Sequence, residues 1–168
     1  IFYLILFLYI LVFLEIFINF QNYKFIPLAY ILISFLFFFL IKFNNNNFLS
    51  FNLFVFIIVI FDTFSYIIGK FFGKNKLIKI SPNKTIEGLF GGVIISLVMS
   101  LLFIFLLDIN LNIEIVIFIL TIITFAFVGD IIESFFKRKN KLKNSSKLIP
   151  GHGGIFDRFD SFLFSIIF

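Results

Sequence analysis

The chain has 168 residues, of which 61% are hydrophobic and only 14% are charged, and its mean hydropathy is +1.16. Soluble domains average about 45–50% apolar and about 25% charged residues, and one of this size cannot hide so much hydrocarbon from water. The same numbers exclude a disordered chain, which needs low hydrophobicity and high charge. The net charge is +5, and the lack of Cys excludes disulfides, thiolate metal sites and a cysteine nucleophile. We therefore expect lipid to surround most of the protein.

Five apolar stretches are long enough to cross the hydrocarbon core of a membrane, which takes about 20 residues. They are Ile1–Phe20, Phe25–Phe43, Phe48–Phe72, Ile86–Leu107 and Ile113–Phe136. Only Glu15 and Asn19 interrupt the first. A sixth, Phe159–Phe168, is about half the required length. It is either a re-entrant segment or a helix that has been cut, and we favour the cut; because the chain begins with Ile, we expect a fragment. The predicted fold class is all-α: a polytopic membrane bundle with about five full spans and a short C-terminal helix.

The basic residues predict how the chain is oriented in the membrane. Twelve of the 14 lie in two polar segments, Lys70–Thr85 and Lys137–Arg158, which two predicted spans separate. The turn between those spans, Asp108–Asn112, has no Lys or Arg. By the positive-inside rule, both basic segments face the cytoplasm and the Asp108 turn faces outward.

Three carboxylates fall within the predicted spans, and such groups are costly in lipid, so Asp62, Asp130 and Glu133 need a reason to be there. Asp130 and Glu133 are followed by Ser134 and Lys137, at i, i+3, i+4 and i+7. This spacing predicts that the four side chains share one face of a helix.

A glycine-rich segment, Pro150-Gly-His-Gly-Gly-Ile-Phe-Asp-Arg-Phe-Asp160, follows shortly afterwards. Its three glycines permit a tight backbone that approaches a ligand closely. Asp157 and Asp160 are three residues apart at the start of a predicted helix. Carboxylates beside several basic groups suit Mg²⁺ that holds a phosphorylated substrate.

These segments resemble the phosphatidate cytidylyltransferase (CDP-diacylglycerol synthase) family. The family pattern runs S-x-x-K-R, a spacer, K-D, then P-G-H-G-G-x-x-D-R-x-D, and it is matched by Gly129–Arg138 (GDIIESFFKR), Lys143 and Pro150–Asp160. Upstream, Asp62–Gly73 (DTFSYIIGKFFG) is similar to the family's D-T-G-A-Y…G, and Ile80–Gly88 (ISPNKTIEG) is similar to I-S-P-K-K-T-x-E-G. Order and spacing agree from Asp62 to Asp160.

The chain departs from the family pattern at two positions. Asn144 stands where the family has the Asp of K-D, and Phe64 stands where it has the Gly of D-T-G-A-Y. The family also has more N-terminal spans and a full final helix. These departures bear on activity more than on ancestry.

The resemblance implies a Mg²⁺-dependent enzyme that converts CTP and phosphatidate to CDP-diacylglycerol and pyrophosphate for phospholipid biosynthesis. It implies that residues 1–60 are N-terminal membrane spans and that residues 61–168 form the catalytic membrane domain. Asp130 and Asp157 are then the metal ligands and, with Lys137, Arg158 and His152, the catalytic set. The remaining candidates, assigned to substrate binding, are Ser134, Arg138, Lys147, Gly153, Gly154 and Asp62.

The implied partners are CTP, phosphatidate and the lipid bilayer, with no nucleic acid. The implied location is the inner membrane with the active site facing the cytoplasm, and dimerisation is an expectation from the family alone. The alternatives left open are a CTP-dependent lipid kinase, a cytidylyltransferase for another lipid phosphate, and a scaffold that has lost catalysis. Residue by residue, His152 and Asp160 also suit helix or turn capping, and Glu133 suits orienting Lys137.

Overall fold

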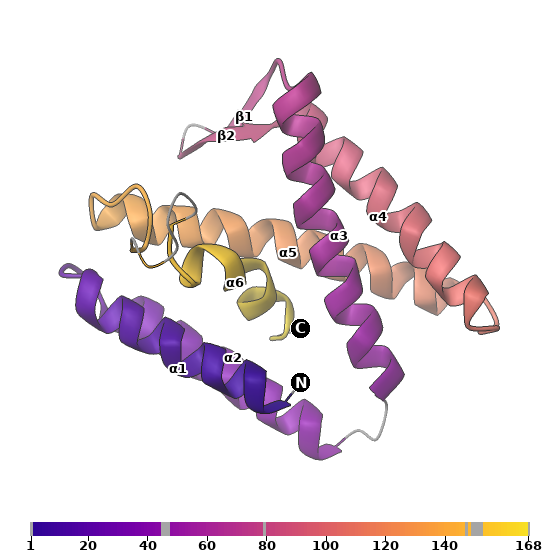
Figure 1. Ribbon diagram of the computed structural model, residues 1–168, viewed down its shortest axis with the longest axis horizontal. Helices are drawn as coiled ribbons and strands as arrows, with labels where there is room; N and C mark the ends of the chain where they lie inside the picture. Colours follow the sequence, from indigo (N-terminus) through magenta and orange to yellow (C-terminus); the bar gives the residue numbers. More distant parts are fainter. Residues whose placement is uncertain (1, 45–47, 79, 147, 149–152, 168) are drawn as a thin grey trace. The chain divides into compact units, whose positions relative to one another are not determined.

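The computed structural model describes residues 2–44, 48–78, 80–146, 148 and 153–167, and among these the regular elements are helices apart from one two-stranded hairpin (Figure 1). The elements are α1 (Phe2–Asn19), α2 (Phe25–Asn44), α3 (Phe48–Phe72), β1 (Lys76–Ile78), β2 (Ser81–Thr85), α4 (Ile86–Leu106), α5 (Ile113–Lys139) and α6 (Phe156–Ser165). The chain forms two compact units. Unit 1 holds residues 1–46 and 129–168, and unit 2 holds residues 47–128.

The helices confirm an all-α integral membrane protein, but not five full spans. Among the described residues, three helices are long and apolar enough to cross a membrane: Phe51–Phe72, Ile86–Leu106 and Ile113–Lys139. Only 22–28% of their most apolar windows is buried inside the protein, so most of these side chains face outward, as lipid permits. The apolar parts of α1 and α2, Tyr3–Asn19 and Phe25–Ile41, are shorter. At the end of α1, the Asn19 side chain donates to the Glu15 carbonyl at 2.9 Å and satisfies one of the last carbonyls of the helix.

One predicted helix boundary needs correction, and another is confirmed. Helix α5 ends at Lys139 rather than Phe136, because its last turn takes in Lys137, Arg138 and Lys139, whose charges are favourable at the negative end of a helix dipole. Helix α6 begins at Phe156, before the apolar stretch Phe159–Phe168. Asp157 therefore lies at the start of a helix, as the sequence predicts.

Unit 1 is built around one apolar face of α1. The buried residues of this helix recur every three or four positions, which is the helical period: Ile5, Tyr9, Val12 and Ile16. Helix α2 lies against α1, and α6 contacts both (Figure 1). The Tyr9 hydroxyl and the Ser34 hydroxyl of α2 are 2.6 Å apart, so a buried hydrogen bond joins the first two helices.

Unit 2 is built around a close approach of α3 and α4. Small buried residues recur at every fourth position of α4: Gly88, Gly92, Ser96 and Ser100. A Cβ placed on Gly88 would lie 2.7 Å from the Ser65 carbonyl oxygen of α3. Small residues at this spacing let two helix backbones approach in lipid, where there is no hydrophobic drive to hold them together.

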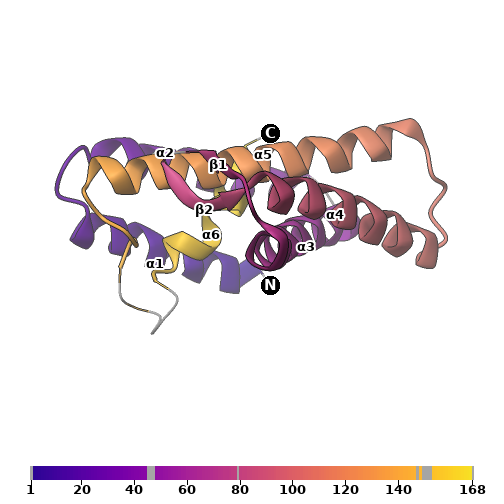
Figure 2. The same cartoon turned by 90° about the horizontal axis from the view of Figure 1, so that it is seen from above.

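The hairpin between α3 and α4 occupies part of the polar segment Lys70–Thr85, for which the sequence predicted no strands (Figure 2). Strands β1 and β2 pair antiparallel, with Lys76 opposite Thr85 and an irregularity in the register. Thr85 then caps α4, since its hydroxyl oxygen accepts the Gly88 N–H at 3.1 Å. The Glu87 carboxylate accepts the backbone N–H groups of Lys74 and Asn75 at 3.1 and 3.2 Å. These bonds fix the hairpin to the first turn of α4.

Candidate functional site

Lys137 is the centre of a charged cluster at the C-terminal end of α5, in unit 1. Its ammonium nitrogen lies 2.5 Å from Glu133 Oε2, one helical turn earlier, and 2.8 Å from Asp157 Oδ1, in the first turn of α6. Glu133 is only 2% exposed, and among the described residues its Oε1 has no hydrogen-bond partner. The predicted i, i+4 relation of Glu133 and Lys137 is thus observed, and α6 brings a second carboxylate to the same cation.

Asp157 accepts hydrogen bonds on both carboxylate oxygens. Besides Lys137, the Ser145 N–H lies 3.2 Å from Oδ1 and 3.0 Å from Oδ2, and the Gly154 N–H lies 2.8 Å from Oδ2. Burial by itself acts to raise the pKa of this carboxyl. Hydrogen bonding with Glu133, Gly154 and Lys137 outweighs burial and lowers the pKa from 3.8 to about 2. Asp157 is therefore a firmly held anion at neutral pH.

The two described glycines of the glycine-rich segment make room for carboxylates of the protein itself. Gly153 has φ +87°, a left-handed conformation that side chains rarely adopt, and a Cβ there would overlap Asp157 Oδ2. A Cβ on Gly154 would overlap Glu15 Oε1 and Ser145 Oγ. Both glycines are buried. Their small size is thus needed to pack two acidic side chains against the loop.

Glu15 is the part of this arrangement that the sequence analysis missed. It lies on α1, is 2% exposed, and its Oε2 accepts the N–H groups of Ile155 and Phe156 at 2.8 and 3.1 Å. Its Oε1 accepts the hydroxyl of Ser145. The available signal was one acidic residue in an otherwise apolar stretch, because a carboxylate in that setting needs partners.

Asp130, the other predicted metal ligand, lies one turn before Glu133 on α5. Its Oδ1 is 2.9 Å from the Ser161 hydroxyl of α6. Helix α6 therefore carries one predicted ligand, Asp157, and contacts the other, Asp130. Ser134 is buried on the same helix. The structure therefore gathers Lys137, Glu133, Asp157, Gly153 and Gly154 in one cluster, and ties Asp130 to the helix that carries Asp157.

The other predicted site residues are placed differently. Arg138 and Arg158 are exposed, and Arg138 also donates to the Leu142 carbonyl at 3.0 Å. Asp62 is half-buried on α3, which belongs to unit 2. Lys147 and His152 lie outside the described residues.

The fit of this site to a metal ion depends on two carboxylates. Among the described residues, no three His, Cys, Asp or Glu side chains gather in a group that would hold a metal. Asp157 has donors on both oxygens, and Asp130 has the Ser161 hydroxyl on one. One or two carboxylates are nevertheless what proteins commonly give Mg²⁺, with substrate phosphates and waters completing the shell. The donor set therefore fits an ion that is shared with a phosphorylated ligand.

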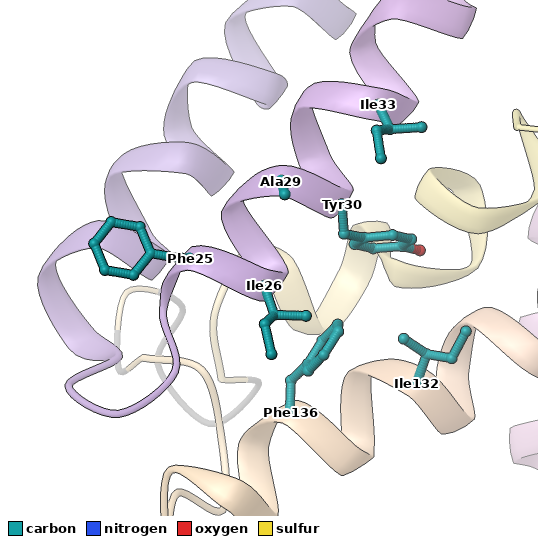
Figure 3. A pocket seen from close by; sticks show the side chains of 7 residues that line it. All are labelled: Phe25, Ile26, Ala29, Tyr30, Ile33, Ile132 and Phe136. Carbon is teal, nitrogen blue, oxygen red and sulfur yellow. The ribbon is translucent and has the colours of Figure 1, made fainter.

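An open apolar groove of about 530 Å³ lies between α2 and α5 in unit 1 (Figure 3). Its lining residues are Phe25, Ile26, Ala29, Tyr30, Ile33, Ile132 and Phe136. Figure 3 shows Phe136 and Ile132 of α5 facing Ile26 and Tyr30 of α2. Such a lining accommodates hydrocarbon rather than a nucleotide.

The helices and the cluster together define an integral membrane protein with buried acids paired to a lysine at the end of one helix. A family model described as the cytidylyltransferase family matches residues 1–168, and the chain belongs to that family. The phosphatidate cytidylyltransferases of Staphylococcus haemolyticus and Staphylococcus aureus are each 44% identical to it over 139 residues, and that of Staphylococcus epidermidis is 43% identical. In each case the match covers 81% of this chain and 52% of the relative, so the chain spans about half the length of these curated relatives.

Proposed function

We propose that the protein transfers the cytidylyl group of CTP to phosphatidate, giving CDP-diacylglycerol and pyrophosphate. The observation that carries the proposal is the Lys137–Asp157 pair, at 2.8 Å, which joins two segments of the family motif that are 20 residues apart. Family membership and the names of the staphylococcal relatives support the same reaction. An open apolar groove on the same helix, lined by Ile132 and Phe136, is consistent with a substrate that carries hydrocarbon.

In this reaction a phosphate oxygen of phosphatidate attacks the α-phosphorus of CTP. The bond from that phosphorus to the bridging oxygen breaks, and pyrophosphate leaves with the electron pair. Phosphoryl-type transfers depend mainly on positioning and charge neutralisation. We assign the exposed Arg138 and Arg158 to phosphate contacts, since a guanidinium grips phosphate with two hydrogen bonds. Ser134, Lys147, His152 and Asp62 remain predicted contacts.

We further propose that Asp130 and Asp157 hold Mg²⁺ together with the substrate phosphates. When bound, the ion would neutralise negative charge on the phosphates. Asp157 suits this role because it stays ionised at neutral pH and because Lys137, at 2.8 Å, orients its carboxylate. We also propose an inner-membrane location with this site on the cytoplasmic side, based on the distribution of Lys and Arg. Dimerisation stays a prediction.

The test is formation of CDP-diacylglycerol in membranes that hold the protein, with and without Mg²⁺, for the wild type and for Asp157→Asn. We expect activity that needs both the metal and Asp157, with a loss on the order of 100-fold in the variant. Asp108→Asn is the matched control. It makes the same chemical change at a turn in unit 2, at φ +54°, where Asn is also well tolerated.

Each other result has a defined meaning. Release of CDP in place of pyrophosphate would identify a lipid kinase. Activity on another lipid phosphate alone would change the substrate. Full activity of Asp157→Asn would keep the function and reject the site. Inactive wild-type protein that regains activity on Asn144→Asp would identify a decayed enzyme.

A further inference from the structure

Glu15 is a buried carboxylate on an otherwise apolar helix. It is the only charged residue of α1 and is 2% exposed, and burying a carboxylate costs several kcal/mol unless it is hydrogen-bonded. Among the described residues, three groups donate hydrogen bonds to Glu15, and all belong to the loop before α6 or to α6 itself. They are the N–H groups of Ile155 and Phe156, at 2.8 and 3.1 Å, and the hydroxyl of Ser145.

The hydrogen bonds from Ile155 and Phe156 to Glu15 provide the N-terminal cap that α6 lacks. The first N–H groups of a helix have no partner within the helix, and a side chain at the N-cap usually accepts them. The N-cap residue of α6 is Ile155, which offers no side-chain hydrogen bond. Glu15 provides the acceptor from α1 instead, and places a negative charge at the positive end of the helix dipole.

The second contact links Glu15 to Asp157. Ser145 donates its hydroxyl to Glu15 and its backbone N–H to Asp157, at 3.0 Å from Oδ2. Gly154 packs against Glu15 and donates its N–H to Asp157 at 2.8 Å. The same two loop residues are thus held between the two carboxylates.

We propose that Glu15 is a positioning residue for the site. By capping α6 and holding Ser145, it keeps the Asp157 carboxylate beside Lys137 in the geometry that the reaction needs. The catalytic part of this inference rests on the proposed function. The anchoring part does not, since it concerns only which acceptor orders residues 153–157.

The experiment compares Glu15→Leu, Glu15→Gln and Tyr9→Phe in the full chain. Leu has a similar volume to Glu and is favourable in an apolar environment, but it accepts no hydrogen bond. Gln keeps one oxygen for the two N–H groups, but it removes the charge and replaces the oxygen that accepts the Ser145 hydroxyl with an amide NH2 group. Tyr9→Phe is the matched control, because it removes a buried 2.6 Å hydrogen bond from the same helix without touching the loop.

Two readouts are needed: amide hydrogen exchange of residues 153–157, and kcat and KM for CTP. For Glu15→Leu we expect faster exchange at Ile155 and Phe156 and a fall in kcat on the order of 10- to 100-fold, as small displacements of reacting groups produce. We expect Glu15→Gln to keep exchange at Ile155 and Phe156 within about threefold of wild type, since it keeps their acceptor, and to lower kcat less than Glu15→Leu does. Tyr9→Phe leaves both unchanged.

Unchanged exchange in Glu15→Leu would overturn the anchoring, and unchanged kcat beside active wild type would overturn the role in catalysis. A loss in Tyr9→Phe equal to that in Glu15→Leu would also overturn the proposal, since it would reflect general loosening of α1. Inactive wild type would overturn the proposed function alone. The exchange data would still decide whether Glu15 holds the loop.

Discussion

The surroundings of Asp157 in unit 1 and the α3–α4 contact in unit 2 are stabilised in opposite ways. Near Asp157, buried charges and hydrogen bonds from three segments converge: Glu15 from α1, Lys137 from α5 and Ser145 from the loop. Between α3 and α4, the contact consists of small residues, with Gly88 against the Ser65 carbonyl. Helices in lipid associate through polar contacts or through close packing, and this protein uses one in each unit.

The two kinds of contact have different effects: one holds helices together, and the other orients a charged side chain. Close packing of small residues holds two helices together but orients no charged group. Hydrogen bonds to a carboxylate fix its orientation, and an anion that binds substrate or metal needs a fixed orientation. We therefore expect substitutions near Asp157 to reduce activity strongly, and substitutions between α3 and α4 to reduce mainly stability, with a smaller effect on activity through the predicted Asp62 contact.

The largest effect should come from Lys137→Met. This change leaves Glu133, 2% exposed, without its cation and removes one donor from Asp157. Breaking a buried ion pair costs about 3–5 kcal/mol, because the remaining charge stays buried. We expect the free energy of unfolding, measured by thermal unfolding in detergent, to fall by that amount. We also expect loss of CDP-diacylglycerol synthesis.

Lys139→Met is the control for that prediction. Lys139 is exposed and lies 5.0 Å from the ring centroids of Tyr23 and Phe135, a contact worth about 0.5–1 kcal/mol. Adding Glu133→Leu to Lys137→Met should recover part of the stability, since no buried charge is then left unpaired. Equal losses in Lys137→Met and Lys139→Met would contradict the importance of the cluster.

The next effect should come from Gly154→Ala. The new Cβ would overlap the Glu15 carboxylate and the Ser145 hydroxyl, so the loop must shift and Asp157 with it. We expect a cost of about 1–3 kcal/mol from overpacking. We also expect kcat to fall on the order of 10-fold, measured per folded protein. A variant with normal kcat would show that the loop tolerates displacement.

Gly88→Ala makes the same substitution in unit 2. Its Cβ would lie 2.7 Å from the Ser65 carbonyl oxygen and 2.9 Å from the Gly69 Cα, so two backbones must separate. We expect the free energy of unfolding to fall by about 1–3 kcal/mol, and kcat of the folded fraction to fall less than in Gly154→Ala. Val98→Ala, on the exposed side of α4, should change stability by less than about 0.5 kcal/mol. A fall in kcat for Gly88→Ala as large as that for Gly154→Ala would break the contrast between the two units.

The sequence predicted those features that depend on local spacing. Apolar runs located all five long helices, and the i, i+4 spacing predicted the Glu133–Lys137 pair. The pairing of Asp157 with Lys137 across 20 residues was not predicted as a contact, although the family motif placed both in one site.

What the sequence concealed depends on contacts between distant residues. The start of α6 carries no capping signal, because its acceptor is Glu15, 140 positions away from Ile155. The hairpin was hidden because Ser81–Thr85 (SPNKT) is polar throughout and contains Pro82, so it lacks the alternation that marks a strand. The number of full spans depends on where α1 and α2 end, which hydropathy fixes only to within a few residues.

Thr85→Ala should have the smallest effect. It removes the acceptor of the Gly88 N–H, at 3.1 Å, and loss of an N-cap costs about 1 kcal/mol. Thr85→Ser keeps the hydroxyl and should recover most of that loss in thermal unfolding. If Ser loses as much as Ala, the Thr85 methyl group is responsible instead. That methyl packs so closely on Gly73 that a Cβ there would lie 2.6 Å from it, so close packing would then extend from the α3–α4 contact to the hairpin.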